Sequence, residues 1–193
     1  MKKKVLVMLL SALVVLSIGQ AAFASSNVGL TAGYGFGGAF AVEVYGEYQF
    51  SDLFSLYGGA RSYIVSGGTA IYASLAGKFN IYGNNTFNVG AFLDVSTIGV
   101  IGGGNVLFPG LFVGPGVYAD VNIFEKINLY AKINFMMLLI PLMPGGSFDF
   151  GFNISHIAVG ASYQITENIS VGIKGATELL QTFTIGANVE YKF

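Results

Sequence analysis

The chain contains no cysteine and no tryptophan, and only 10% of its 193 residues are charged. The absence of cysteine excludes disulfides, thiol catalysis and a lipid-modified N-terminal cysteine. The formal net charge is -1, and no basic cluster follows the first four residues, so the electrostatic footprint of a nucleic-acid-binding protein is missing. Soluble surfaces typically carry roughly a quarter to a third of their residues as charged side chains. The chain therefore lacks the charge to cover itself in water.

The first 24 residues have the three parts of a secretory signal peptide. Lys2, Lys3 and Lys4 precede an apolar run over residues 5–16, and the small residues Ala22 and Ala24 frame a cleavage site. The apolar run is shorter than the ~20 residues that a helix needs to cross a membrane, which favours a cleaved signal over a permanent anchor. We expect export of the chain, with a single mature domain over residues 25–193.

Apolar and polar residues alternate with period two from Val28 onward, and no segment keeps a helical stripe, so the mature chain is predicted to be all-β. Short polar turns at 51–52, 83–85, 125–126 and 166–168 alternate with reversals at 37–38, 66–68, 102–104, 144–146 and near 180–181. Four turns on one side and five on the other predict ten antiparallel strands with both termini at one end, as single-chain bacterial barrels require. We assign the short turns to the periplasmic side.

The ten strands are expected to start near Val28, Phe40, Phe54, Thr69, Thr86, Leu107, Asn128, Phe148, Ile169 and Thr182. If residues 28–36 formed a loop, the barrel would have eight strands with a different pairing. The alternation also changes parity near Ser155 and His156, and a β-bulge there would reconcile the two halves of that strand.

The charged residues decide which face meets which solvent. Eleven of them fall on the polar face of their strands: Glu43, Glu47, Arg61, Lys78, Asp94, Asp120, Lys132, Lys174, Glu178, Glu190 and Lys192. On a lipid-facing wall, each Lys or Arg near the midplane would cost about 2 to 4 kcal/mol. The polar face is therefore predicted to face the lumen, and the apolar face to meet lipid. Eight aromatic residues near the short turns form a candidate interfacial girdle: Tyr48, Phe50, Phe54, Phe79, Phe87, Tyr163, Tyr191 and Phe193.

These features make the chain resemble small bacterial outer-membrane β-barrel proteins of the porin-like or OmpA-OmpX-like class. The resemblance rests on the signal peptide, on the alternation over residues 28–193 and on the ending NVEYKF. It implies a closed antiparallel up-and-down transmembrane β-barrel in the outer membrane of a Gram-negative envelope. It also implies partners: outer-membrane lipid, the export machinery, and a barrel assembly machinery that recognises Val189, Tyr191 and Phe193.

The lumen residues leave two alternatives open. In a narrow barrel their side chains meet near the axis, either as a paired network that fills the lumen or as the lining of a thin aqueous pore. The outer halves of the sixth and seventh strands are apolar on both faces, with Met136, Leu138 and Ile140 expected to point toward the lumen. Such an oily outer mouth would suit a small hydrophobic ligand, or it would plug the barrel.

Signals for chemistry are few. His156 is the only histidine and lies beside Ser155 and near Asp149, but neighbouring strand residues point to opposite faces unless a bulge re-aims one of them. No metal-ligand spacing occurs, and we expect no cofactor and no catalytic residue. The function expected from the sequence is that of a non-enzymatic outer-membrane barrel, structural or surface-exposed, or a narrow passive channel with a charge-lined lumen. A lipid-modifying hydrolase is the remote alternative.

Overall fold

A computed structural model describes residues 27–36, 38–65, 67–102, 105–124, 126–142, 146–178 and 182–193. The predicted signal peptide, with Ala22 and Ala24, lies outside the described residues. The strands are β1 (Asn27–Gly35), β2 (Phe40–Gln49), β3 (Phe54–Val65), β4 (Gly68–Gly83), β5 (Phe87–Gly102), β6 (Asn105–Leu107), β7 (Gly110–Ile123), β8 (Ile127–Pro141), β9 (Asp149–Gln164), β10 (Ile169–Glu178) and β11 (Thr182–Lys192). Among the described residues, no helix is long and apolar enough to span a membrane.

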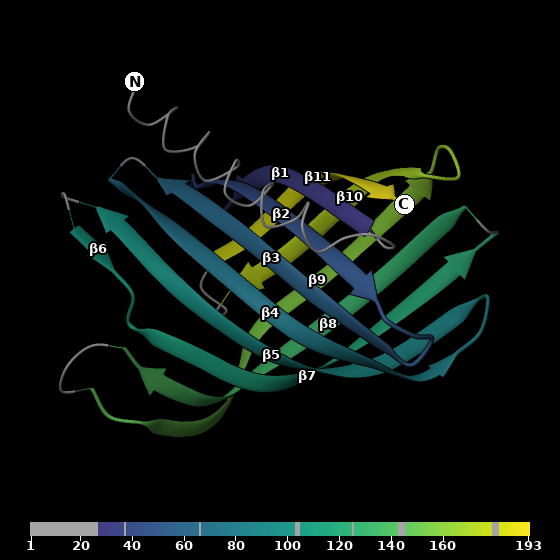
Figure 1. Ribbon diagram of the computed structural model, residues 1–193. Helices are drawn as coiled ribbons and strands as arrows, with labels where there is room; N and C mark the ends of the chain where they lie inside the picture. Colours follow the sequence, from purple (N-terminus) through teal and green to yellow (C-terminus); the bar gives the residue numbers. More distant parts are fainter. Residues whose placement is uncertain are drawn as a thin grey trace.

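The strands form one closed antiparallel barrel. The hydrogen-bonded order is β4-β3-β2-β1-β11-β10-β9-β8-β7-β5-β6, and an additional pairing of β4 with β5 closes the circle. The first and last strands pair along their length, from Asn27 opposite Lys192 to Gly35 opposite Thr184. The tilted strands wrap around the barrel in Figure 1. The expected ten-stranded up-and-down barrel is confirmed, and the eight-stranded alternative is excluded because β1 is a paired strand.

The short strand β6 is the outer piece of an interrupted barrel strand. It pairs with β5 from Val100 to Gly102, and β7 continues the pairing with the same strand from Thr97 downward. The break falls at Phe108 and Pro109, where proline has no N–H to donate to a ladder. The barrel therefore has ten wall positions although the described residues form eleven strands.

Two bulges disturb the long hairpin of β8 and β9. Asn134 pairs with His156, but the next residue, Phe135, pairs with Ile154, so Ser155 is an extra residue in β9. This confirms the bulge predicted from the change of parity. A second irregularity lies in β8 itself, where Val113 and Gly116 of β7 pair with residues 138 and 134. Three residues of β8 therefore stand opposite two of β7.

The start of β1, the end of β11 and four short turns lie at one end of the barrel, which we call the terminal end; the other five reversals lie at the loop end. Side chains organise three of the short turns by accepting backbone N–H groups, as polar turn residues do. Ser51 Oγ accepts the N–H of Phe54 at 3.1 Å, and Asn84 Oδ1 accepts the N–H of Phe87 at 2.8 Å. Thr166 Oγ1 accepts the N–H of Ile169 at 3.0 Å.

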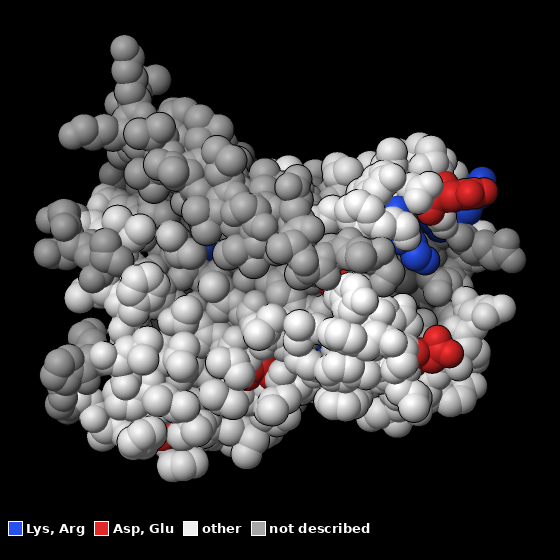
Figure 2. Space-filling view, in the orientation of Figure 1, with Lys and Arg blue, Asp and Glu red and all other residues white. Residues whose placement is uncertain are grey.

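The outer wall is apolar and the lumen wall is polar. Large hydrophobic side chains that alternate with the charged ones are exposed on the outside, including Leu75, Leu93 and Ile173 at 53%, 54% and 63%. In Figure 2 the charged atoms gather mainly at the end of the molecule where the C-terminus lies, and most of the described face carries none. At that end, Phe50 lies within 4.5 Å of Tyr48 and 5.4 Å of Phe54 between ring centroids. The predicted aromatic girdle has the outward placement expected of it.

Candidate functional site

The lumen wall carries the charged residues that the sequence assigned to it. Four of them are buried: Glu43, Arg61, Asp94 and Lys174. Five are half-buried and line a cavity in the lumen: Glu47, Lys78, Asp120, Lys132 and Glu190. The backbone of Glu178 pairs with His156, and its side chain lies outside the described part of the structure. Lys192 lines the same cavity close to the C-terminus.

A buried ionic cluster lies near the middle of the barrel. The Glu43 carboxylate accepts a hydrogen bond from the Arg61 guanidinium at 2.7 Å and another from Lys174 Nζ at 2.6 Å. Arg61 also donates to the Tyr63 hydroxyl at 3.0 Å. Glu43 belongs to β2 and Lys174 to β10, and the barrel order places β1 and β11 between these strands. The cluster therefore bridges side chains across part of the lumen, over 131 residues of sequence.

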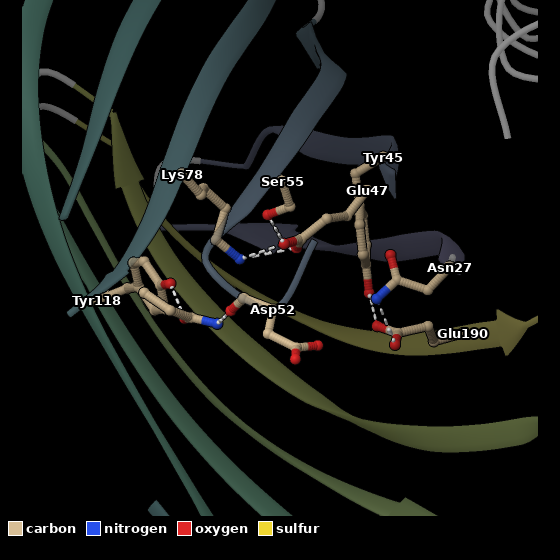
Figure 3. Close-up of polar contacts among 9 residues, drawn as sticks. Asn27, Tyr45, Glu47, Asp52, Ser55, Lys78, Tyr118 and Glu190 are labelled. Atoms are coloured by element: carbon tan, nitrogen blue, oxygen red, sulfur yellow. Dashed lines mark hydrogen bonds and ion pairs between the residues drawn. The ribbon is translucent and has the colours of Figure 1, made fainter. Parts of the chain in front are cut away.

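A second polar network lies nearer the terminal end and is shown in Figure 3. Lys78 Nζ donates to both oxygens of Glu47, at 2.8 and 2.7 Å, and the Ser55 hydroxyl donates to the same carboxylate. On the other side of Figure 3, Glu190 accepts hydrogen bonds from Asn27 and from the Tyr45 hydroxyl, each at 3.1 Å. This network is partly open to the cavity.

Two contacts join walls that lie almost opposite each other. Lys132 of β8 places its ammonium 4.6 Å from the ring centroid of Tyr57, which belongs to β3. The rings of Tyr72 on β4 and His156 on β9 stack with centroids 6.5 Å apart and an interplanar angle of 11°. Around the circle of ten wall positions, the two strands of each pair are four steps apart, and five steps would be directly opposite. Side chains therefore meet in the interior of the lumen instead of leaving an open axis.

A cavity of about 970 Å³ occupies the lumen toward the terminal end. Its opening is lined by turn residues such as Asp52, Asn84 and Asn168, and its depth reaches Lys132 and His156. Asparagine and tyrosine side chains make much of its wall. Lys174 of the Glu43 cluster reaches the wall of the cavity, and Glu43 and Arg61 lie beyond its closed end, so the lumen has an open part, which we call the hydrated part, and a filled part.

The filled part contains acceptor oxygens without hydrogen-bond donors. Asp94 and Asn134 are 3% and 2% exposed, and one side-chain oxygen of each has no partner among the described residues. Asn134 and Ser96 are the polar neighbours of Asp94. Lys132 is the cation with the strongest electrostatic attraction to the Asp94 carboxylate. Buried oxygens of this kind are ordinarily satisfied by ordered water.

Sequence reasoning found the charged lumen residues but missed the aromatic ones. Tyr45, Tyr57, Tyr118, Tyr130 and Phe92 fill space between the charges, and each has the same parity as the charges on its own strand. That parity is the signal that could have found them. Small residues make room for the rings: a Cβ on Gly160 would lie 2.4 Å from the Tyr130 ring, and one on Gly116 would lie 2.0 Å from the Phe92 ring.

The expected oily outer mouth needs correction. Directly opposed residues of antiparallel strands share a face, and Leu138 and Ile140 stand opposite Val113 and Leu111, which lie on the outer face of β7. Leu138 and Ile140 therefore face outward, and only Met136 keeps the predicted inward placement. The bulge in β8 shifts the parity by one residue, so Leu139 turns inward instead. Its Cδ1 atom lies 2.7 Å from where a Cβ on Gly110 would stand.

The structure does not bring together the three residues that suggested hydrolysis. His156 is buried in the lumen at 7% exposure, and Ser155 is the extra residue of the bulge. Asp149 pairs with Leu139 at the loop end, seven residues from His156, which corresponds to roughly 20 Å along a strand. Within the described part of the chain, no group of three His, Cys, Asp or Glu side chains could hold a metal ion.

Comparisons with known proteins bear on the fold. No protein-family model and no curated protein matches the sequence. Among solved structures, the outer membrane protease OmpT from Escherichia coli is similar with a TM-score of 0.65 at 11% identity, covering 88% of this chain and 97% of that chain. The KdgM porin gives a TM-score of 0.48 at 9% identity, covering 86% and 99%. Neisserial surface protein A gives 0.40 at 13%, covering 88% and 95%. The chain has the transmembrane β-barrel fold of outer-membrane proteins.

Proposed function

We propose that the protein is an integral, non-enzymatic barrel of the bacterial outer membrane whose lumen is closed at mid-height, so that it serves as a structural or surface barrel and not as an open pore. The observation that carries this proposal is the pair of contacts between nearly opposite walls, Lys132 with Tyr57 and Tyr72 with His156. An aqueous channel needs a continuous path, and these contacts lie across it.

The orientation of the barrel follows from its turns. Outer-membrane barrels have short periplasmic turns and longer extracellular loops. The terminal end holds both ends of the strand circuit and only short turns, whereas the longest connection, between β8 and β9, lies at the loop end; this supports a periplasmic location for the terminal end and for the cavity opening. The Glu43 cluster and the loop end then separate the cavity from the exterior of the cell.

Absence of enzymatic activity is part of the proposal. It is supported by the separation of Asp149 from His156 and by the burial of the histidine among lumen side chains. Incubation of the folded barrel with outer-membrane phospholipid, followed by mass spectrometry of the lipid, tests this point. A lipid product that disappears in His156→Ala would contradict it.

Conductance in planar bilayers tests the closed lumen. The wild-type barrel, shown to be folded by its different gel mobility before and after boiling, is expected to give no steady current. A Tyr72→Ala/Lys132→Ala double variant removes both crossing contacts and is expected to give discrete channel steps. An outward-facing pair, Leu75→Ala/Leu93→Ala, is the matched control and should remain silent. Steady wild-type conductance would overturn the proposal.

A further inference from the structure

The lysines in the depth of the lumen differ in their partners. Lys174 and Lys78 each form an ion pair, with Glu43 at 2.6 Å and with Glu47 at 2.7 Å. Lys132 has no carboxylate within ion-pair distance among the described residues. Asp94 is the carboxylate with the strongest electrostatic attraction to Lys132, and the Asp94 side chain is buried beyond the closed end of the cavity. The Lys132 side chain lines the cavity.

Two aromatic rings frame the Lys132 ammonium. Its Nζ lies 4.6 Å from the ring centroid of Tyr57 and 4.5 Å from that of Phe92. Ring faces attract a cation but do not accept its three N–H groups as oxygen atoms do. The ammonium therefore keeps its capacity to donate charge-assisted hydrogen bonds toward the cavity.

The surroundings of Lys132 suit the rest of a small molecule. A volume of about 970 Å³ falls within the range of small-molecule sites, which combine apolar and aromatic walls with a few placed polar groups. Tyr57, Phe92 and Tyr118 supply aromatic wall near the closed end. The neighbouring strand β7 carries Asp120, an acid without an ion-pair partner among the described residues. Lys132 stands opposite Tyr118 in this pairing, and Asp120 stands opposite Tyr130, two residues nearer the terminal end. Asp120 therefore lies one step closer to the opening.

We propose that the closed end of the cavity binds small organic carboxylates, with Lys132 as the anchor of the carboxylate group and Tyr57 and Phe92 beside the carbon skeleton. The site deepens the proposed function and rests on it, because a lumen closed beyond Lys132 is what makes the cavity a binding site. The carboxylate would take the position that no acidic side chain of the described chain occupies.

Binding is tested with 4-fluorobenzoate as the probe, observed by fluorine NMR on the barrel in lipid nanodiscs. The neutral 4-fluorobenzyl alcohol and the cationic 4-fluorobenzylamine are the comparison probes. Wild type is expected to bind the benzoate, and Lys132→Met to weaken that binding at least tenfold. Lys132→Arg, which keeps the charge, should retain it. Lys126→Met removes a lysine at the cavity opening and should change the affinity less than twofold.

Several outcomes would overturn the site. Wild type that fails to bind 4-fluorobenzoate contradicts it, as does equal binding by Lys132→Met with unaltered gel mobility. Preference for 4-fluorobenzylamine, lost in Asp120→Asn, would make the cavity a cation site instead. The two proposals can fail separately. If the wild-type barrel conducts but binds benzoate through Lys132, the proposal of a closed lumen is wrong and the proposal of a carboxylate site stands.

Discussion

The hydrated and filled parts of the lumen use the same chemistry under different solvation. In the cavity, the side chains of Lys78 and Glu47 are 20% and 22% exposed. In the filled part, those of Arg61 and Glu43 are 5% and 9% exposed. Both are ion pairs with an N to O distance of 2.7 Å, so geometry does not distinguish them. The difference teaches that the cost of removing one partner depends on whether water can reach the charged group that is left behind.

Loss of Glu43 is the largest effect that this comparison predicts. Glu43→Ala leaves Arg61 and Lys174 facing each other without their shared acceptor in a nearly dry region. Breaking a buried ion pair by removing one partner typically costs about 3 to 5 kcal/mol. We expect a decrease of that size in the free energy of unfolding, measured by urea denaturation of the barrel in lipid vesicles.

A triple variant separates charge from packing in that experiment. Glu43→Leu/Arg61→Met/Lys174→Met replaces the whole cluster with apolar residues, and such replacements are often neutral or stabilising. It should recover most of the stability that Glu43→Ala loses. If the single variant costs less than about 1 kcal/mol, a threshold typical of exposed pairs, the filled part is as hydrated as the cavity.

Glycines beneath aromatic rings give a second, smaller contrast. A Cβ on Gly116 would collide with Phe92, which is 3% exposed, and with the buried Asn134. Overpacking of this kind typically costs about 1 to 3 kcal/mol. A Cβ on Gly160 meets the Tyr130 ring, which is only half-buried and has space to move away. Gly116→Ala is therefore expected to lower the free energy of unfolding more than Gly160→Ala does.

Gly58→Ala is the control for this pair, because its Cβ would make only an ordinary contact with Leu75 at 3.6 Å. All three variants lie in strands, so differences among them report the space above each glycine and not strand propensity. Equal costs for Gly116→Ala and Gly160→Ala would mean that the half-buried Tyr130 ring is held as rigidly as the buried Phe92 ring.

The fold was predictable because lipid and water impose opposite demands on alternate residues. Each strand keeps its charges on one parity, and a slip by one residue would bury charge in hydrocarbon. The strand starts, the ten-stranded closure and the bulge at Ser155 followed from that rule. The bulge was visible since polar and apolar residues of β9 exchange parity around it.

The second bulge left no such trace in the sequence. Residues 135–142 are apolar on both faces, so a shift of parity in β8 changes no pattern. This is why Leu138 and Ile140 were assigned to the wrong face. The pairing among lumen charges was equally out of reach: Glu43 and Lys174 are 131 residues apart, and parity states only that both point inward.

The smallest predicted effect is that of breaking the ion pair between Lys78 and Glu47 in the hydrated part of the lumen. It is the most direct comparison with the loss of Glu43 in the filled part. Lys78→Ala leaves Glu47 open to the cavity and still accepting the Ser55 hydroxyl, so water replaces most of the lost interaction. Exposed ion pairs contribute about 0 to 1 kcal/mol, and we expect a loss of free energy of unfolding within that range. Added salt should reduce the loss further, because ions enter the cavity and screen the pair. A loss as large as that of Glu43→Ala, independent of salt, would show that the two parts of the lumen do not differ in solvation.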